Sequence, residues 1–129
     1  MLDYIRDVAY ITAGRIGWHW HDYEGLMQRL KEELENEGLK PTRLYYKRDN
    51  WYGMIYMVPI APADLKFMLK ISREYSQDTL IFLGRLYDVA TGRMIGEFTR
   101  ATFYTEKPDV PSWIEINQPD NRTYYLVLS

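Results

Sequence analysis

Two histidines in one short stretch are the residues of this chain most suited to metal chemistry. Both histidines of the sequence lie in the run Trp-His-Trp-His at positions 18–21, directly before Asp22. In an extended chain alternate residues share a face, so the imidazoles of His19 and His21 would project together. Two imidazoles with Asp22 or Glu24 as a further ligand form a divalent-metal site that leaves positions open for water. The stretch therefore predicts, as one hypothesis, a metal-dependent nuclease or hydrolase.

A tyrosine nucleophile would complete such a nuclease, and the candidates are Tyr23 and Tyr75. The competing hypothesis for the same stretch is packing: the aromatic run over 18–23 covers the start of a helix and leaves the histidines partly exposed. We favour packing, because the stretch directly precedes a helix cap instead of lying in an apolar central strand.

Aromatic and basic side chains alternate along the predicted strands and form a second candidate site. Sheets of this kind stack the bases of single-stranded nucleic acid on exposed rings and hold the phosphates with arginine. We favour the alternative that the same rings fill the second face of the sheet or contact a second subunit; a small-ligand pocket is a further alternative. The candidate ligand-binding residues are Tyr45, Trp51, Tyr52, Tyr56, Arg85 and Arg100.

The sequence lacks the residues that several other catalytic and binding chemistries require. The chain has no cysteine, which excludes a thiol nucleophile, a disulfide framework and a thiolate zinc site. The segment 14–17, Gly-Arg-Ile-Gly, lacks the third glycine of a dinucleotide loop, and no serine lies in a Gly-x-Ser-x-Gly turn. We expect no cofactor.

Size and charge narrow the class further. The 129 residues are 47% apolar and 26% charged, as expected of one globular domain over 1–129. Sixteen basic against eighteen acidic residues give a net charge of −2, which disfavours non-specific phosphate binding. No run approaches the roughly 18 apolar residues of a membrane span, so we expect a cytoplasmic protein. The few amides and absent thiols also agree with a thermophilic source.

Two amphipathic helices are predicted. The first runs from about Asp22, its cap, to Glu37, with Gly38 following its end. The second begins at Pro62, because proline suits the first helical position. The apolar stripes are Tyr23, Leu26, Met27, Leu30 and Leu34 in the first helix, and Leu65, Met68, Leu69 and Tyr75 in the second.

Strands surround these helices. The segments 42–48 and 51–58 form a hairpin around Asp49 and Asn50, and 80–88 and 93–105 are joined through Gly92. The remaining predicted strands are 8–12, 113–116 and 123–128.

This order predicts an α+β fold with a ferredoxin-like (split βαβ) core, two helices on one face of a mostly antiparallel sheet, and extra C-terminal strands. An alternative places a further strand over 16–21. Either fold leaves an aromatic sheet face, and we expect it to join two chains as a homodimer. The function expected is binding or assembly without catalysis, with single-stranded nucleic acid as an alternative ligand and no membrane as a partner.

Overall fold

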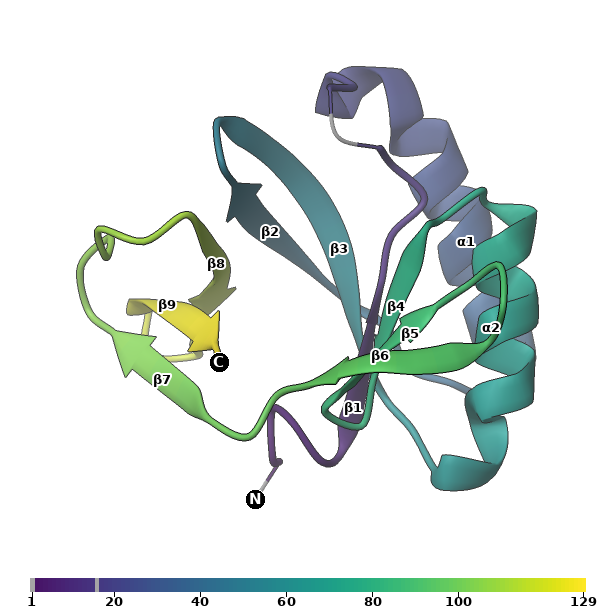
Figure 1. The fold of residues 1–129 in the computed structure, drawn as a ribbon. Coiled ribbons are helices and arrows are strands. Elements are labelled where there is room, and N and C mark those ends of the chain that lie inside the picture. Colours follow the sequence, from purple (N-terminus) through teal and green to yellow (C-terminus); the bar gives the residue numbers. More distant parts are fainter. Residues whose placement is uncertain (1, 16) are drawn as a thin grey trace.

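The computed structural model describes residues 2–15 and 17–129 and consists of nine strands, two α-helices and two short 3₁₀ turns (Figure 1). In chain order the elements are β1 (Val8–Ile11), η1 (Trp20–Tyr23), α1 (Glu24–Asn36), β2 (Thr42–Arg48), β3 (Trp51–Pro59), η2 (Pro62–Asp64), α2 (Leu65–Glu74), β4 (Thr79–Phe82), β5 (Arg85–Asp88), β6 (Arg93–Glu97), β7 (Ala101–Tyr104), β8 (Ser112–Asn117) and β9 (Thr123–Leu128).

All nine strands belong to one curled sheet with the order β6-β5-β4-β1-β3-β2-β8-β9-β7, and every pairing is antiparallel. The molecule is a half-barrel with two short helices, so the predicted ferredoxin-like fold is wrong. The error has a local origin. The predicted strand over 93–105 is broken at 98–100, and its two halves become the opposite edges of the sheet.

This break forces the sheet to curl. The three residues 98–100, here called the strap, span at most about 14 Å between β6 and β7. The edges of a flat nine-stranded sheet would lie about 38 Å apart at the usual strand spacing. Backbone hydrogen bonds hold the strap: the N–H of Thr99 donates to the carbonyl of Ser129 at 2.8 Å, and the N–H of Phe98 donates to that of Gly84 at 2.6 Å. Figure 1 shows β6 leading through the strap to β7.

The helices cover the convex face over the middle of the sheet. They bury Met27, Leu30 and Leu34 from α1 and Met68, Leu69 and Ile71 from α2. Their strand partners on β1, β3 and β4 are Ala9, Ile11, Met54, Tyr56, Val58, Leu80 and Phe82.

The first helix begins later than its sequence predicts. Asp22 lies inside η1, and α1 starts at Glu24. The end agrees better: Gly38 has a φ of +80° and donates its N–H to the carbonyl of Glu35 at 2.9 Å. The alternative strand over 16–21 is not formed at its end, because Trp20 and His21 belong to η1. Ile16 and the side chain of Trp20 lie outside the described residues.

A second core fills the concave face. It contains Val8, Tyr10, Leu44, Met57, Ile114, Ile116 and Leu126. Because β1 packs against both cores, all four of its residues are buried. The predicted two-layer fold leaves this face open, whereas the curl lets the sheet cover itself.

Candidate ligand-binding sites

The concave face leaves a cavity of about 670 Å³, within the range of sites that bind small molecules. Its floor is apolar and comes from both wings of the curled sheet and from the strap. The floor residues are Ile55, Ile81, Leu86, Phe98, Ile114, Leu126 and Leu128. Most of them are only partly covered, so the cavity offers apolar surface to a ligand.

Two loops build the polar rim of the cavity. The guanidinium of Arg15 donates from Nε and Nη2 to the carbonyl of Ser76, at 3.2 and 2.8 Å. The amide of Gln77 donates to the carbonyl of Gly14 at 3.0 Å. These bonds join the segment after β1 to the segment before β4. Arg15 and, at the end of β2, Arg48 outnumber Asp78 and make the rim basic overall.

Among the described residues that line this cavity, Tyr10 and Tyr46 are the only tyrosines. The hydroxyl of Tyr10 donates to the carbonyl of Tyr4 at 2.7 Å. Burial raises the pKa of Tyr10 and the pKa of Tyr46 above the usual tyrosine value. Both rings therefore stay neutral near pH 7, and the charge of the cavity comes from its rim.

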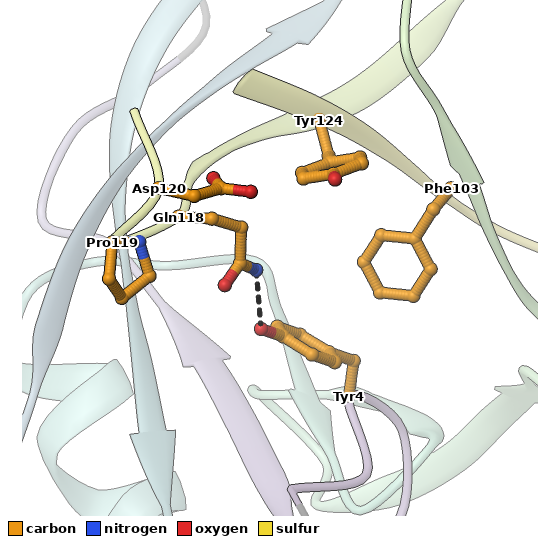
Figure 2. A pocket seen from close by; sticks show the side chains of 6 residues that line it. All are labelled: Tyr4, Phe103, Gln118, Pro119, Asp120 and Tyr124. Carbon is orange, nitrogen blue, oxygen red and sulfur yellow. Dashed lines mark hydrogen bonds between the residues drawn. The ribbon is translucent and has the colours of Figure 1, made fainter. Parts of the chain in front are cut away.

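A second pocket, of about 490 Å³, lies on the concave side near the N-terminal segment (Figure 2). The rings of Tyr4 and Phe103 meet edge to face, with centroids 5.2 Å apart and planes at 78°. The amide of Gln118 donates to the hydroxyl of Tyr4 at 3.5 Å. The pocket is lined by Tyr4, Phe103, Gln118, Pro119, Asp120 and Tyr124.

The two histidines lie together, as expected, but through a different geometry. His19 precedes η1 as its cap, and its Nδ1 accepts the backbone N–H of His21 at 3.3 Å. Their rings stack with centroids 4.8 Å apart and planes at 19°. In the part of the chain that the structure describes, no three histidine or acidic side chains form a group that could hold a metal ion. Asp22 and Glu24 are thus not joined to the pair as ligands.

Both candidate tyrosine nucleophiles are engaged elsewhere. Tyr23 is buried under the sheet, where its hydroxyl accepts the N–H of Met54 at 2.9 Å. Burial raises the pKa of Tyr23, and burial together with Glu33 raises the pKa of Tyr75 to about 12. A nucleophile needs the opposite shift, so neither ring is activated for attack.

The six predicted ligand-binding residues do not meet on one surface. Tyr56 is buried beneath α1, where its hydroxyl donates to the carbonyl of Met27 at 3.0 Å. Trp51 pairs with Arg48 and faces away from Tyr52. Of the others, Tyr45 lies on the convex face of β2, Arg85 on β5 at the far wing, and Arg100 in the strap.

A continuous aromatic surface does exist on the convex face beyond the helices. Residues directly opposite in antiparallel strands share a face, and the register places aromatic side chains of five strands in two neighbouring rows on this face. Lys47 lies opposite both Tyr52 and Trp113, and its ammonium is 4.7 Å from the centroid of the Trp113 ring. We call this the outer aromatic face; its rings are Tyr45, Tyr52, Tyr104, Trp113 and Tyr125.

Sequence reasoning missed both cavities. The sequence of β1 and β3 is apolar at nearly every position, which indicates that both faces of these strands are buried. It does not indicate that the second face encloses a cavity.

No protein-family model matches the chain, and no curated protein or solved structure shows a significant match to it. What the chain binds must therefore be inferred from its own cavities.

Proposed function

We propose that this protein is a non-catalytic binding protein whose concave cavity holds a small amphipathic anion. The observation that carries this proposal is the combination of an open apolar floor with a basic rim. A ligand with an aliphatic or aromatic body would cover the floor, and burial of its surface would supply most of the affinity. A carboxylate, sulfonate or phosphate group would then lie at the rim.

The rim guanidiniums are the groups suited to the anionic end. Arg48 projects from the concave face of β2 and is exposed, so its donors remain accessible to a ligand. Arg15 is fixed by its two bonds to Ser76, which reduces the entropy lost on binding. Lys47 contributes less, because its ammonium lies over the Trp113 ring on the convex side.

A fluorescent anion tests this proposal. The probe 8-anilino-1-naphthalenesulfonate carries an aromatic body and one sulfonate, and decanoate serves as a competitor. We expect the probe to bind the folded protein, and Arg48→Glu to weaken its binding about fivefold through loss and reversal of one exposed charge. The matched control is Arg93→Glu on the exposed strand β6, outside the cavity lining, which should bind as the unchanged protein does.

Cavity filling gives the second arm. Leu86→Phe places a larger side chain at the floor and should also weaken binding of the probe. An unchanged unfolding temperature would show that the fold of this variant is intact. Equal affinity in Arg48→Glu, Leu86→Phe and the unchanged protein would place the probe elsewhere and contradict the proposal.

Self-association is a second candidate function, favoured by the outer aromatic face. Tyr45, Tyr52 and Tyr104 are all at least 40% exposed, and among the described residues the core beneath the helices includes none from β2, β7, β8 or β9. A second copy suits this face better than nucleic acid, since Glu115 lies opposite both Tyr45 and Tyr125 and repels phosphate. A cytoplasmic location stays a prediction from the sequence.

A further inference from the structure

Three aromatic rings around the second pocket come from distant parts of the chain. Tyr4 belongs to the N-terminal segment, Phe103 to β7 and Tyr124 to β9. In Figure 2 these rings surround a common space, with the carboxylate of Asp120 at its border. Phe103 keeps 43% of its surface exposed and Tyr4 and Tyr124 are only partly covered, so the rings are available to a ligand.

The polar groups of this pocket are acidic or neutral. Asp120 comes from the turn between β8 and β9, where its Oδ1 accepts the N–H of Arg122 at 2.9 Å. The Nε of Arg122 is 3.7 Å from Oδ2, in a pair exposed on both sides, which neutralises the carboxylate only weakly. Of the described residues, no lysine or arginine lines the pocket. Its electrostatic preference is thus opposite to that of the concave cavity.

We propose that this pocket, the aromatic cage, binds a quaternary or trimethylated ammonium group. The faces of aromatic rings carry negative charge density, and they attract a cation held within about 6 Å. A methylated ammonium also presents apolar methyl groups to the rings and has no N–H to leave unpaired. The carboxylate of Asp120 adds charge complementarity at the open side.

The same chemistry has two sources, a free small molecule and the side chain of a trimethylated lysine in a peptide. Choline, tetramethylammonium chloride and a short trimethyl-lysine peptide represent these sources. The neutral analogue 3,3-dimethyl-1-butanol has the shape of choline with carbon in place of nitrogen. It isolates the contribution of charge from that of apolar contact.

Binding is measured by titration with backbone amide NMR, which reports the position of the ligand and the state of the fold together. We expect choline or the peptide to shift resonances of β7, β9 and the β8–β9 turn, and the neutral analogue to bind about tenfold more weakly. Phe103→Ala should weaken binding of the cation about tenfold, and Asp120→Asn about threefold because its carboxylate is exposed. Matched controls are Tyr104→Ala, whose ring faces outward on the same strand, and Asp109→Asn, which lies outside the pocket.

The relative affinities for the peptide and for choline identify the natural ligand. Tighter binding of the trimethyl-lysine peptide indicates a protein ligand, and tighter binding of choline indicates a free small molecule. Equal affinity for choline and its neutral analogue, or unchanged affinity in Phe103→Ala with the fold retained, would overturn the proposal. The anion titration of the concave cavity is independent of these outcomes.

Discussion

Tyrosine hydroxyls tie the separate layers of this molecule together. Tyr56 donates to the carbonyl of Met27 in α1, and Tyr23 accepts the backbone N–H of Met54 in β3. Both rings are 1% exposed, so each polar tip is satisfied inside the core. The abundance of tyrosine in the sequence therefore does not translate into an equally large binding surface.

The pH dependence of stability should reveal the tyrosines whose pKa is raised by the fold, Tyr75 above all. The usual tyrosine pKa is about 10, and burial with Glu33 nearby raises the pKa of Tyr75 to about 12. Because the folded state holds this proton more tightly, the contribution of Tyr75 to the unfolding free energy is complete below about pH 10 and is lost as pH rises to 12. Burial shifts the pKa of Tyr10, Tyr23 and Tyr46 in the same direction.

Urea unfolding at closely spaced alkaline pH values measures this effect. Tyr75→Phe should reduce the fall in unfolding free energy between pH 10 and about 12, and the matched control Tyr52→Phe, on the exposed outer aromatic face, should leave the fall unchanged. An identical fall in Tyr75→Phe and the unchanged protein would show that Tyr75 does not couple to folding.

At the level of the elements, replacing glycine by alanine should change the unfolding free energy in opposite directions at Gly84 and Gly25. Gly84, in the turn between β4 and β5, has a φ of +80°, and an added Cβ would lie 2.5 Å from Cγ2 of Ile5. Gly84→Ala should therefore lower the unfolding free energy by about 1 to 3 kcal/mol. Gly25, in α1, has nothing within 4 Å of an added Cβ, and Gly25→Ala should raise it by about 0.5 to 1 kcal/mol.

Denaturant unfolding of both variants under one condition checks the pair. A neutral Gly84→Ala would mean that the β4–β5 turn and the strap, which bonds to Gly84, can shift at little energetic cost. A destabilised Gly25→Ala would place that position outside a regular helix.

The elements that sequence predicts well are those fixed by local signals. The hairpin at Asp49 and Asn50 is confirmed by the pairing of β2 with β3, and the turn ending at Gly92 by the pairing of β5 with β6. The strand predicted over 80–88 is wrong, because a turn at Leu83 and Gly84 divides it into β4 and β5, which pair with each other. The sheet as a whole depends on pairings between distant segments, such as β2 with β8. Nothing in the run over 93–105 indicates that its two halves pair at opposite edges, and the fold prediction failed there.

The candidate sites show the same division. The proximity of His19 and His21 follows from their spacing and is seen in the structure, although a 3₁₀ turn and not a strand produces it. The aromatic cage depends on the tertiary meeting of Tyr4, Phe103 and Tyr124, which no spacing in the sequence encodes.

For the whole molecule, the outer aromatic face predicts association. Light scattering at micromolar concentration should give twice the 15.5 kDa mass of one chain. Tyr52→Glu, at a position that is 61% exposed, should yield folded monomers because a carboxylate buried in the interface would be desolvated. Tyr56 is unsuitable for this test, since a charge at that buried position would unfold the chain.

A monomeric unchanged protein would contradict the association. The matched control is Ile95→Glu on β6, another exposed apolar residue at the opposite edge of the sheet, which should leave the dimer intact. Dissociation by Ile95→Glu but not by Tyr52→Glu would move the interface to the β6 edge.

The strap also connects the two cavities. Phe98, its first residue, lines the concave cavity, and the chain that leaves the strap carries Phe103 into the aromatic cage. Strand β9 also connects the two sites, because Leu126 lines the concave cavity and Tyr124 lines the aromatic cage. Because the two proposed sites share these segments, we expect occupancy of one site to change the affinity of the other, and thermodynamic reciprocity requires both affinities to change by the same factor. If both proposals hold, such coupling would make the binding of the anion depend on the presence of the methylated cation, and the reverse.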